Sequence, residues 1–215
     1  MTFRAQALLF DNDGTLVSSL DSVDRCWARW AEEYGISEEF GRVELHGRPA
    51  VEIVAELLPA GVVPQALARI ETMEVEDVPN GGVHLLPGTR ALLDSLPADR
   101  WAVVTSATRR LAEARLDAVG ILPKTMVTAD DITRGKPDPE PYLLAARELG
   151  VDPADCVVFE DAPAGLAAGR AAGMTTVALT TTHQAHELDA DLVVPDLSAL
   201  NALVIDGGVE ISARL

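Results

Sequence analysis

The stretch that decides the fold is LLFDNDGTLVSS at residues 8–19, where an apolar run leads directly into two aspartates. Asp11 and Asp13 are separated by one residue, and a glycine and a threonine follow them. An apolar run that ends in turn-forming residues predicts a buried β-strand, here over residues 5–10. Two carboxylates at the end of a buried strand repel each other and lose hydration. The pair therefore requires a compensating charge, and a bound cation is the obvious candidate.

Further along the chain, short apolar runs alternate with segments of helical periodicity. The predicted strands are residues 101–106, 125–129, 156–161, 175–179 and 191–195, and the predicted helices are 89–96, 109–119, 139–149, 163–172 and 197–203. Strands that alternate with helices predict a parallel sheet with helices on both faces. The end of the chain contains Asp206-Gly207-Gly208, which predicts a hairpin over residues 204–214.

Residues 20–78 interrupt this alternation, because they contain only helix and turn signals. The segments with helical spacing of apolar residues are 21–34, 48–58 and 64–76. We therefore expect an α/β fold with a Rossmann-like parallel-sheet core and an inserted α-helical cap. The predicted core comprises residues 1–16 and 86–215, and the predicted cap comprises residues 17–85.

The composition argues against several classes of partner. The chain has 215 residues, of which 34 are acidic and 17 basic, and its formal net charge is −17. A chain this acidic lacks the basic face that nucleic-acid phosphates or an anionic membrane require, so we expect neither as a partner. No apolar run approaches the length of about 18 residues that a membrane-spanning helix needs. The N-terminus also lacks a signal-peptide layout, so we expect a cytoplasmic protein.

Polar residues follow four of the predicted strands. In an open parallel sheet, ligands bind beyond the carboxyl ends of the strands, so these residues are expected at one edge. Asp11 and Asp13 follow the first strand. The later strand ends supply Thr105, Ser106, Ala107 and Thr108, then Asp130, Asp131 and Lys136, and finally Glu160 and Asp161. The acids, hydroxyls and lysine together predict a site for a charged ligand.

The acids of this group predict a magnesium site. Asp11, Asp161 and Glu160 offer the hard oxygen ligands that Mg²⁺ takes. Glu160 can equally be a neighbour of the metal ligands that does not bind the metal itself, and both roles stay open. Lys136 adds a positive charge that can hold the carboxylates apart.

The same edge also predicts phosphoryl chemistry. The Ser106 hydroxyl and the backbone N–H groups that follow it, including that of Ala107, can bind phosphate oxygens. A carboxylate beside a metal and a phosphate can act as a covalent nucleophile, which is the role predicted for Asp11. Asp13 could then protonate the leaving oxygen and afterwards deprotonate water.

Four segments resemble, in order and spacing, the motifs of the haloacid dehalogenase-like hydrolase superfamily. They are DNDGTLVSS (11–19), VVTSAT (103–108), GKPDPEPY (135–142) and VVFEDAPAG (157–165). The resemblance covers about residues 5–182. It implies that Asp11 is the nucleophile, that Asp13 is the general acid and base, and that Ser106 and Lys136 hold the phosphoryl group. It also implies that Mg²⁺ is bound by Asp11, the backbone carbonyl of Asp13, and Asp161.

The closer resemblance is to the sugar and polyol phosphatases of that superfamily, such as the 2-deoxyglucose-6-phosphate and glycerol-3-phosphate phosphatases. Asp13 disfavours the dehalogenases and phosphonate hydrolases, which usually lack an acid at this position. The segment HGRPAVEI resembles the substrate-specificity loop of the cap, so His46, Gly47 and Arg48 are candidate substrate-binding residues. The implied substrate is a small phosphorylated metabolite, a sugar or polyol phosphate, and caps of this size often accompany a monomer.

Two alternatives stay open. The β-phosphoglucomutases share all four motifs, but they typically carry an arginine in the cap loop shortly after its glycine. Ala50 stands where that arginine is expected, which favours a phosphatase. A non-catalytic sugar-phosphate-binding module is the other alternative, although a pure binder has no need of an acid and base such as Asp13. Asp130 and Asp131 are better explained as a turn and helix cap, and Trp27 as core packing of the cap.

Overall fold

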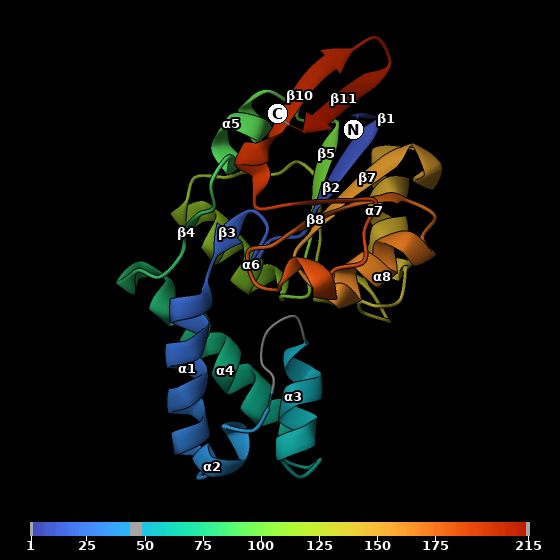
Figure 1. Cartoon of the computed structure of the whole chain (residues 1–215). Coiled ribbons are helices and arrows are strands. Elements are labelled where there is room, and N and C mark those ends of the chain that lie inside the picture. The colour runs from blue at the N-terminus through green and yellow to red at the C-terminus, as the bar shows by residue number, and fades with distance from the viewer. Residues whose placement is uncertain (1, 44–48, 214–215) are drawn as a thin grey trace.

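A six-stranded parallel sheet forms the centre of the molecule (Figure 1). The structure is a computed structural model that describes residues 2–43 and 49–213. The strand order is β6-β5-β2-β7-β8-β9. The strands are β2 (Ala7–Phe10), β5 (Trp101–Val104), β6 (Met126–Val127), β7 (Cys156–Glu160), β8 (Thr175–Leu179) and β9 (Leu192–Val194). The predicted α/β class and parallel sheet are confirmed.

Both faces of this sheet are buried, which explains why its strands are continuously apolar. Side chains alternate between the two faces of a strand. Leu8 and Phe10 pack on one face with the C-terminal strands and with the two helices that follow residue 88. Ala7 and Leu9 pack on the other face. The first face is covered by α5 (Thr89–Asp94) and α6 (Arg109–Ala118), and the second by α7 (Glu140–Leu149) and α8 (Pro163–Ala171).

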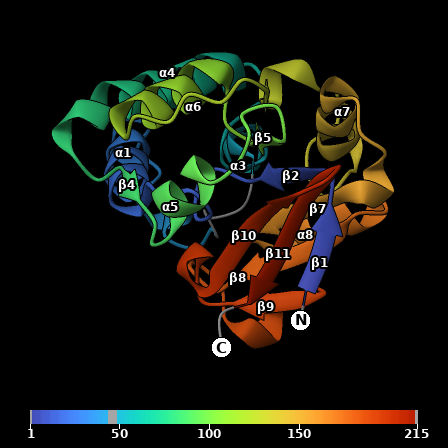
Figure 2. The same cartoon turned by 90° about the horizontal axis from the view of Figure 1, so that it is seen from above.

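A helical region lies beside the strand ends, in the lower half of Figure 1. It comprises α1 (Leu20–Glu33), α2 (Ser37–Phe40), α3 (Ala50–Leu57) and α4 (Val63–Asp77). These helices form their own apolar cluster, in which the indole N–H of Trp30 donates to the carbonyl of Ala66 at 3.0 Å. Helix α4 packs along α6 of the sheet layer (Figure 2). The helical region and the sheet therefore meet next to the predicted site.

Two short strands join the helical region to the sheet. The strands β3 (Val17–Ser18) and β4 (His84–Leu85) pair antiparallel where the chain leaves the sheet layer and where it returns. Short 3-10 helices occur at Val78–Asn80, Ala129–Asp131, Pro153–Asp155, Ala185–Glu187 and Leu197–Ala199. The paired strands hold the two crossings of the chain together.

The C-terminal segment departs in part from the sequence prediction. The strands β10 (Leu200–Ile205) and β11 (Gly208–Ala213) form the predicted hairpin, and β1 (Thr2–Ala5) adds to its edge. The prediction of a helix over residues 197–203 is wrong, because this segment forms one 3-10 turn followed by the start of β10. Its apolar spacing fits a helix, but pairing with β11 satisfies the backbone groups of the segment. The strand predicted over residues 5–10 likewise divides, since β1 and β2 belong to different sheets.

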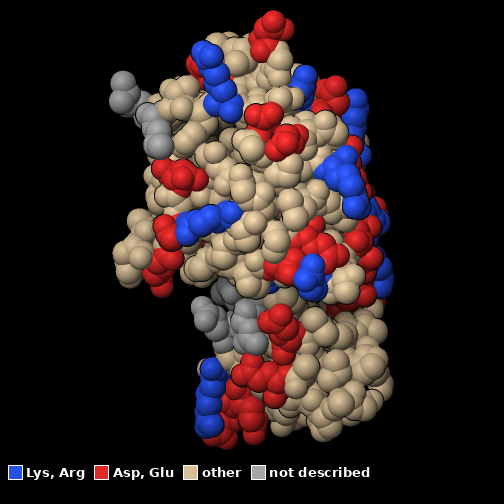
Figure 3. Space-filling view, turned by 90° about the vertical axis from the view of Figure 1, so that its right-hand side faces the viewer, with Lys and Arg blue, Asp and Glu red and all other residues tan. Residues whose placement is uncertain are grey.

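The surface carries its charges in a scattered arrangement. On the face shown in Figure 3, blue basic side chains stand among red acidic ones over both layers of the molecule. Such an arrangement is typical of a solvated surface. Within residues 2–43 and 49–213, none of the helices has the length and apolar character needed to cross a bilayer.

Candidate active site

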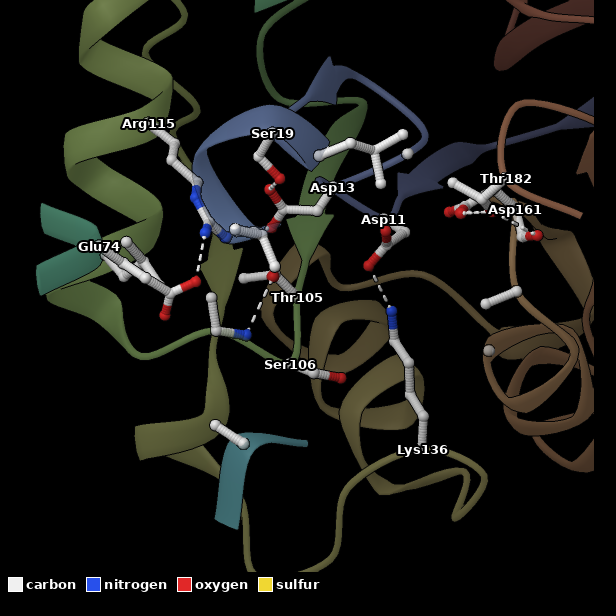
Figure 4. Close-up of a pocket in the computed structure, with 18 of the residues that line it drawn as sticks. Asp11, Asp13, Ser19, Glu74, Thr105, Ser106, Arg115, Lys136, Asp161 and Thr182 are labelled. Atoms are coloured by element: carbon white, nitrogen blue, oxygen red, sulfur yellow. Dashed lines mark hydrogen bonds and ion pairs between the residues drawn. The ribbon is translucent and has the colours of Figure 1, made fainter. Parts of the chain in front are cut away.

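The predicted site residues meet in one pocket at the carboxyl edge of the sheet, facing the helical region (Figure 4). Each comes from the end of a strand or the loop that follows it, as the topology requires. The pocket is lined by Asp11 and Asp13 after β2, Ser106 and Ala107 after β5, Lys136 after β6, and Glu160 and Asp161 at the end of β7. The structure thus brings together residues that are up to 150 positions apart in the chain.

Lys136 lies at the centre of the buried charges. Its Nζ donates to Asp11 Oδ1 at 2.6 Å, to Glu160 Oε1 at 2.6 Å and to the carbonyl of Val104 at 2.9 Å. Burial by itself lowers the pKa of a lysine, but the carboxylates of Asp11 and Glu160 outweigh it and raise the pKa of Lys136. The ammonium is therefore charged at any physiological pH.

Glu160 is held by hydrogen bonds to both of its oxygens. Besides Lys136, its Oε1 accepts from the hydroxyl of Tyr142 at 3.0 Å. Its Oε2 accepts from the backbone N–H groups of Asp161 and Ala162, at 3.0 and 3.1 Å. A Cβ at Gly165 would come within 1.7 Å of Glu160 Oε1, so only glycine leaves room for this carboxylate. These contacts fit a residue that orients Lys136.

Asp161 is buried beside the loop that carries the two aspartates. Its Oδ1 accepts from Thr15 Oγ1 at 3.2 Å, and its Oδ2 accepts from the hydroxyl of Thr182. Gly14 has φ of +89°, and a Cβ there would lie 2.2 Å from Asp161 Oδ2, so both backbone conformation and space require glycine. Burial raises the pKa of Asp161 to about 7, with the Glu160 charge acting in the same direction.

The buried charges fit a divalent cation. Asp11, Glu160 and Asp161 each offer an oxygen, and these oxygens lie within 4.8 Å of one another. Burial raises the pKa of Asp11 above its usual range, and Lys136 offsets this effect only in part. Three buried carboxylates face a single ammonium among the described residues of this cluster, so negative charge is in excess. A bound cation would stabilise the ionised carboxylates, which is the compensation that the sequence predicts.

Asp13 points away from Lys136, toward α1 and α6 (Figure 4). Its Oδ1 accepts from Ser19 Oγ at 2.6 Å, and its Oδ2 lies 3.0 Å from Nη1 of Arg115. The same guanidinium donates from Nη2 to Glu74 Oε1 of α4 at 3.0 Å. Asp13 is partly exposed to the pocket, with 27% of its side chain accessible. It therefore stands at the side of the pocket that faces the helical region.

Sequence reasoning missed Arg115 and Glu74, although both line the pocket. No motif contains them. A signal was nevertheless present, because the buried stripe of α6 consists of Leu111, Ala112, Arg115 and Leu116. An arginine inside an otherwise apolar stripe requires a buried partner, and here it has two.

The loop after β5 supplies the hydroxyl predicted to bind phosphate. Ser106 lies on the pocket wall, and the N–H of Ala107 donates to Thr105 Oγ1 at 3.1 Å. Helix α6 begins only at residue 109, and Thr108 caps it by accepting from the Leu111 N–H at 3.4 Å. The pocket is thus approached by the loop before α6, with the first turn of the helix behind it.

Two further predictions can be compared with the structure. Asp130 accepts from the Arg109 N–H at 2.8 Å, and Asp131 accepts from the Thr128 hydroxyl at 2.7 Å. Their role as a turn and helix cap is confirmed. Trp27 packs in the core of the helical region, as predicted, and it also lines the pocket. The candidate substrate residues His46, Gly47 and Arg48 lie outside the described residues.

Known proteins resemble this chain over most of its length. The haloacid dehalogenase-like hydrolase family matches residues 5–173. Hexitol phosphatase A of Escherichia coli is 38% identical over 202 residues, which cover 92% of this chain and 94% of that protein. The 2-deoxyglucose-6-phosphate phosphatase 1 of Saccharomyces cerevisiae is 32% identical over 240 residues, covering 94% and 92%. The structure of CbbY from Rhodobacter sphaeroides in complex with phosphate superposes with a TM-score of 0.76 at 25% identity, covering 90% and 95%.

The chain belongs to the haloacid dehalogenase-like hydrolases, as its four motifs predict. It is a phosphatase of that family, an enzyme that hydrolyses phosphoric monoesters. The predicted resemblance to sugar and polyol phosphatases is confirmed by the relatives that match nearly the whole chain.

Proposed function

We propose that this phosphatase hydrolyses a small sugar or polyol phosphate through an aspartyl-phosphate on Asp11. The observation that carries the proposal is that the two aspartates of one loop face different sides of the pocket. Asp11 contacts the buried Lys136, whereas Asp13 faces the helical region at the other side of the pocket. The names of relatives that match more than nine tenths of the chain support a sugar or polyol phosphate as the substrate class.

The first half of the reaction transfers the phosphoryl group to the enzyme. Ser106 and Lys136 bind phosphoryl oxygens, and an oxygen of Asp11 attacks phosphorus. The bond from phosphorus to the ester oxygen breaks, and Asp13 gives that oxygen a proton, so the alcohol leaves neutral. General acid catalysis of this kind is typically worth about 10²–10⁴-fold.

The second half of the reaction releases phosphate. Asp13, now ionised, accepts a proton from a water molecule while the water oxygen attacks phosphorus. The bond from phosphorus to Asp11 breaks, which regenerates the carboxylate and frees inorganic phosphate. Asp13 ends the cycle protonated, ready for the next ester.

Mg²⁺ is the proposed cofactor, because the excess of buried negative charge beside Lys136 fits a hard divalent cation. Asp11, Asp161 and the backbone carbonyl of Asp13 would hold it. When bound, it neutralises charge on the phosphoryl oxygens. We assign Glu160 to the positioning of Lys136, because its Oε1 accepts from Lys136 itself and from Tyr142, and its Oε2 accepts from two backbone N–H groups.

The helical region is proposed to be the cap of the enzyme, comprising residues 17–85 between core segments 1–16 and 86–215. Val23, Trp27 and Ile53 of this region line the pocket and can shield the reaction from bulk water. The segment 46–48 is proposed to contact the leaving group. We further propose that the enzyme acts as a cytoplasmic monomer.

Phosphate release from a panel of sugar, polyol and nucleotide monophosphates tests this proposal. The wild-type chain with Mg²⁺ should release phosphate from hexose or polyol phosphates and lose this activity in EDTA. D11N should abolish turnover, because an amide is no nucleophile toward phosphorus. Appreciable turnover by D11N contradicts the assignment of Asp11.

The two alternatives give different results in the same panel. Conversion of β-glucose 1-phosphate to glucose 6-phosphate, in the presence of glucose 1,6-bisphosphate and with little free phosphate, would show a mutase. Binding of sugar phosphates without phosphate release would show a binding module. Ala50, which lines the pocket where a mutase arginine is expected, favours the phosphatase.

A further inference from the structure

Arg115 forms a buried ion-pair cluster with Asp13, in the loop after β2, and with Glu74, in helix α4 of the helical region. Its Nη1 lies 3.0 Å from Asp13 Oδ2, and its Nη2 donates to Glu74 Oε1 at 3.0 Å (Figure 4). Only 5% of the Arg115 side chain and 7% of the Glu74 side chain are accessible. Among the described residues, the Nε of Arg115 has no hydrogen-bond partner.

The guanidinium of Arg115 divides its donors between two carboxylates. An arginine that stabilises one carboxylate does so best with two parallel hydrogen bonds, as Arg69 does with Glu33 at 2.7 Å in both bonds. Arg115 instead gives one terminal nitrogen to each of two carboxylates and leaves its Nε unused. Because a guanidinium is planar and rigid, this arrangement fixes the direction of both carboxylates relative to one helix.

The helix that carries Arg115 is the one that follows the phosphate-binding loop. Ser106 lies just before α6, and Arg115 stands about two turns along that helix. Helix α6 therefore contacts the Asp13 carboxylate through Arg115 and follows directly on the loop that carries Ser106. Glu74 connects Arg115 to helix α4. The two helices have a second contact where the hydroxyl of Thr108, which caps α6, donates to Glu71 of α4 at 2.7 Å.

We propose that Arg115 is a positioning residue that holds the Asp13 carboxylate at the leaving-group side of the pocket and, through Glu74, ties that position to the docked helical region. The role rests on the proposed function, since it acts through Asp13 as acid and base. Where α4 packs against α6, Glu74 accepts a hydrogen bond from Nη2 of Arg115. This contact holds the guanidinium in place, so that Nη1 keeps its direction toward Asp13. Proton transfer by Asp13 thus depends on the contact between α4 and α6.

The choice of leaving group separates this role from a general structural one. A polyol leaves as an alkoxide unless it receives a proton, so its phosphate ester depends on Asp13. The leaving group of p-nitrophenyl phosphate is stable as an anion and needs no proton. R115M should therefore lower kcat for a polyol phosphate by about 10- to 100-fold, which is less than the full contribution of general acid catalysis, about 10²–10⁴-fold, because Asp13 itself remains. The first burst of nitrophenolate should change by less than about threefold.

A double-mutant cycle tests whether Arg115 acts through Asp13. In a D13N background, R115M should cost less than about threefold, because there is no carboxylate left to position. R115K should restore part of the activity, since an ammonium reaches one carboxylate but not both. R69M serves as the matched control, because it removes the same charge from an ion pair within the helical region; its kcat should equal that of the wild type.

Circular dichroism and thermal unfolding establish that each variant is folded. If R115M is unfolded because Glu74 loses its partner, R115M/E74M removes both buried charges and is measured instead, with the same expectation for kcat. Equal losses for both esters, no loss at all, or a full loss retained in the D13N background would each overturn the role of Arg115. A wild-type chain that releases phosphate from none of the esters would overturn the proposed function, and the role of Arg115 with it.

Discussion

The stability of the protein without metal should fall as pH rises, because Asp161 is easier to bury when it is protonated. Its pKa is raised from 3.8 to about 7 in the folded chain. A carboxyl whose folded pKa is raised contributes stability that is complete below its unfolded pKa and is lost as pH rises through the folded value. The loss should therefore extend from about pH 4 to about pH 7.

The size of this effect follows from the shift. A difference of about 3 pKa units corresponds to about 4 kcal/mol, at 1.36 kcal/mol for each unit. For a chain of this length, about 2–4 °C of Tm accompanies each kcal/mol. We therefore expect the EDTA-treated protein to lose about 10 °C of Tm between pH 4.5 and pH 8 from this group alone. In the proposed metal site Mg²⁺ would lie against the ionised carboxylates, so its addition at pH 8 should restore most of the loss.

Thermal unfolding followed by circular dichroism, with EDTA or with Mg²⁺ at a series of pH values, measures the effect. D161N is the control, because it removes the titrating group while other carboxyls of this acidic chain still titrate. The difference between wild type and D161N should carry the pH dependence and the Mg²⁺ response. If the wild-type protein in EDTA shows the same pH dependence as D161N, the explanation based on the burial of Asp161 is wrong.

Two further predictions concern the support of Lys136. G165A should destabilise the protein by about 1–3 kcal/mol in urea unfolding, because its Cβ would collide with Glu160. It should also weaken the inhibition of the enzyme by inorganic phosphate, because Glu160 positions Lys136. G61A, where a Cβ meets no atom within 4 Å, should cost nothing, and equal losses for both variants would contradict the steric explanation. K136M should cost about 3–5 kcal/mol without metal, because it leaves Asp11 and Glu160 buried without their cation. A loss below about 1 kcal/mol would show that water or protonation already compensates these carboxylates.

Much of the fold could be predicted from local patterns. Apolar runs ended by turn residues placed β2, β5, β7 and β8 within a few residues of their observed bounds, and the helices between them follow from 3.6-residue spacing. The segment after residue 197 could not be placed in this way. A short run such as Leu200–Ile205 fits both a helix and a strand, and only its pairing with β11 decides between them.

The residues of the candidate site show the same division between local pattern and tertiary packing. The sequence places Asp11 and Asp13 at a strand end, and topology places Lys136 and Asp161 at the same edge. The sequence does not show that Glu160 accepts hydrogen bonds from Tyr142 and Lys136, since those contacts depend on the packing of α7 against the sheet.

What the sequence by itself determined is the α/β class, the inserted helices, and the set of acids, hydroxyls and lysine at one sheet edge. Periodicity and strand order determine these features, because both act over short distances or through a simple topological rule. Only the tertiary structure decided that Arg115 joins Asp13 to Glu74, and that glycine is required at positions 14 and 165. Contacts of this kind depend on how α4 docks on α6 and how closely α8 approaches β7, and a linear pattern carries no record of those distances.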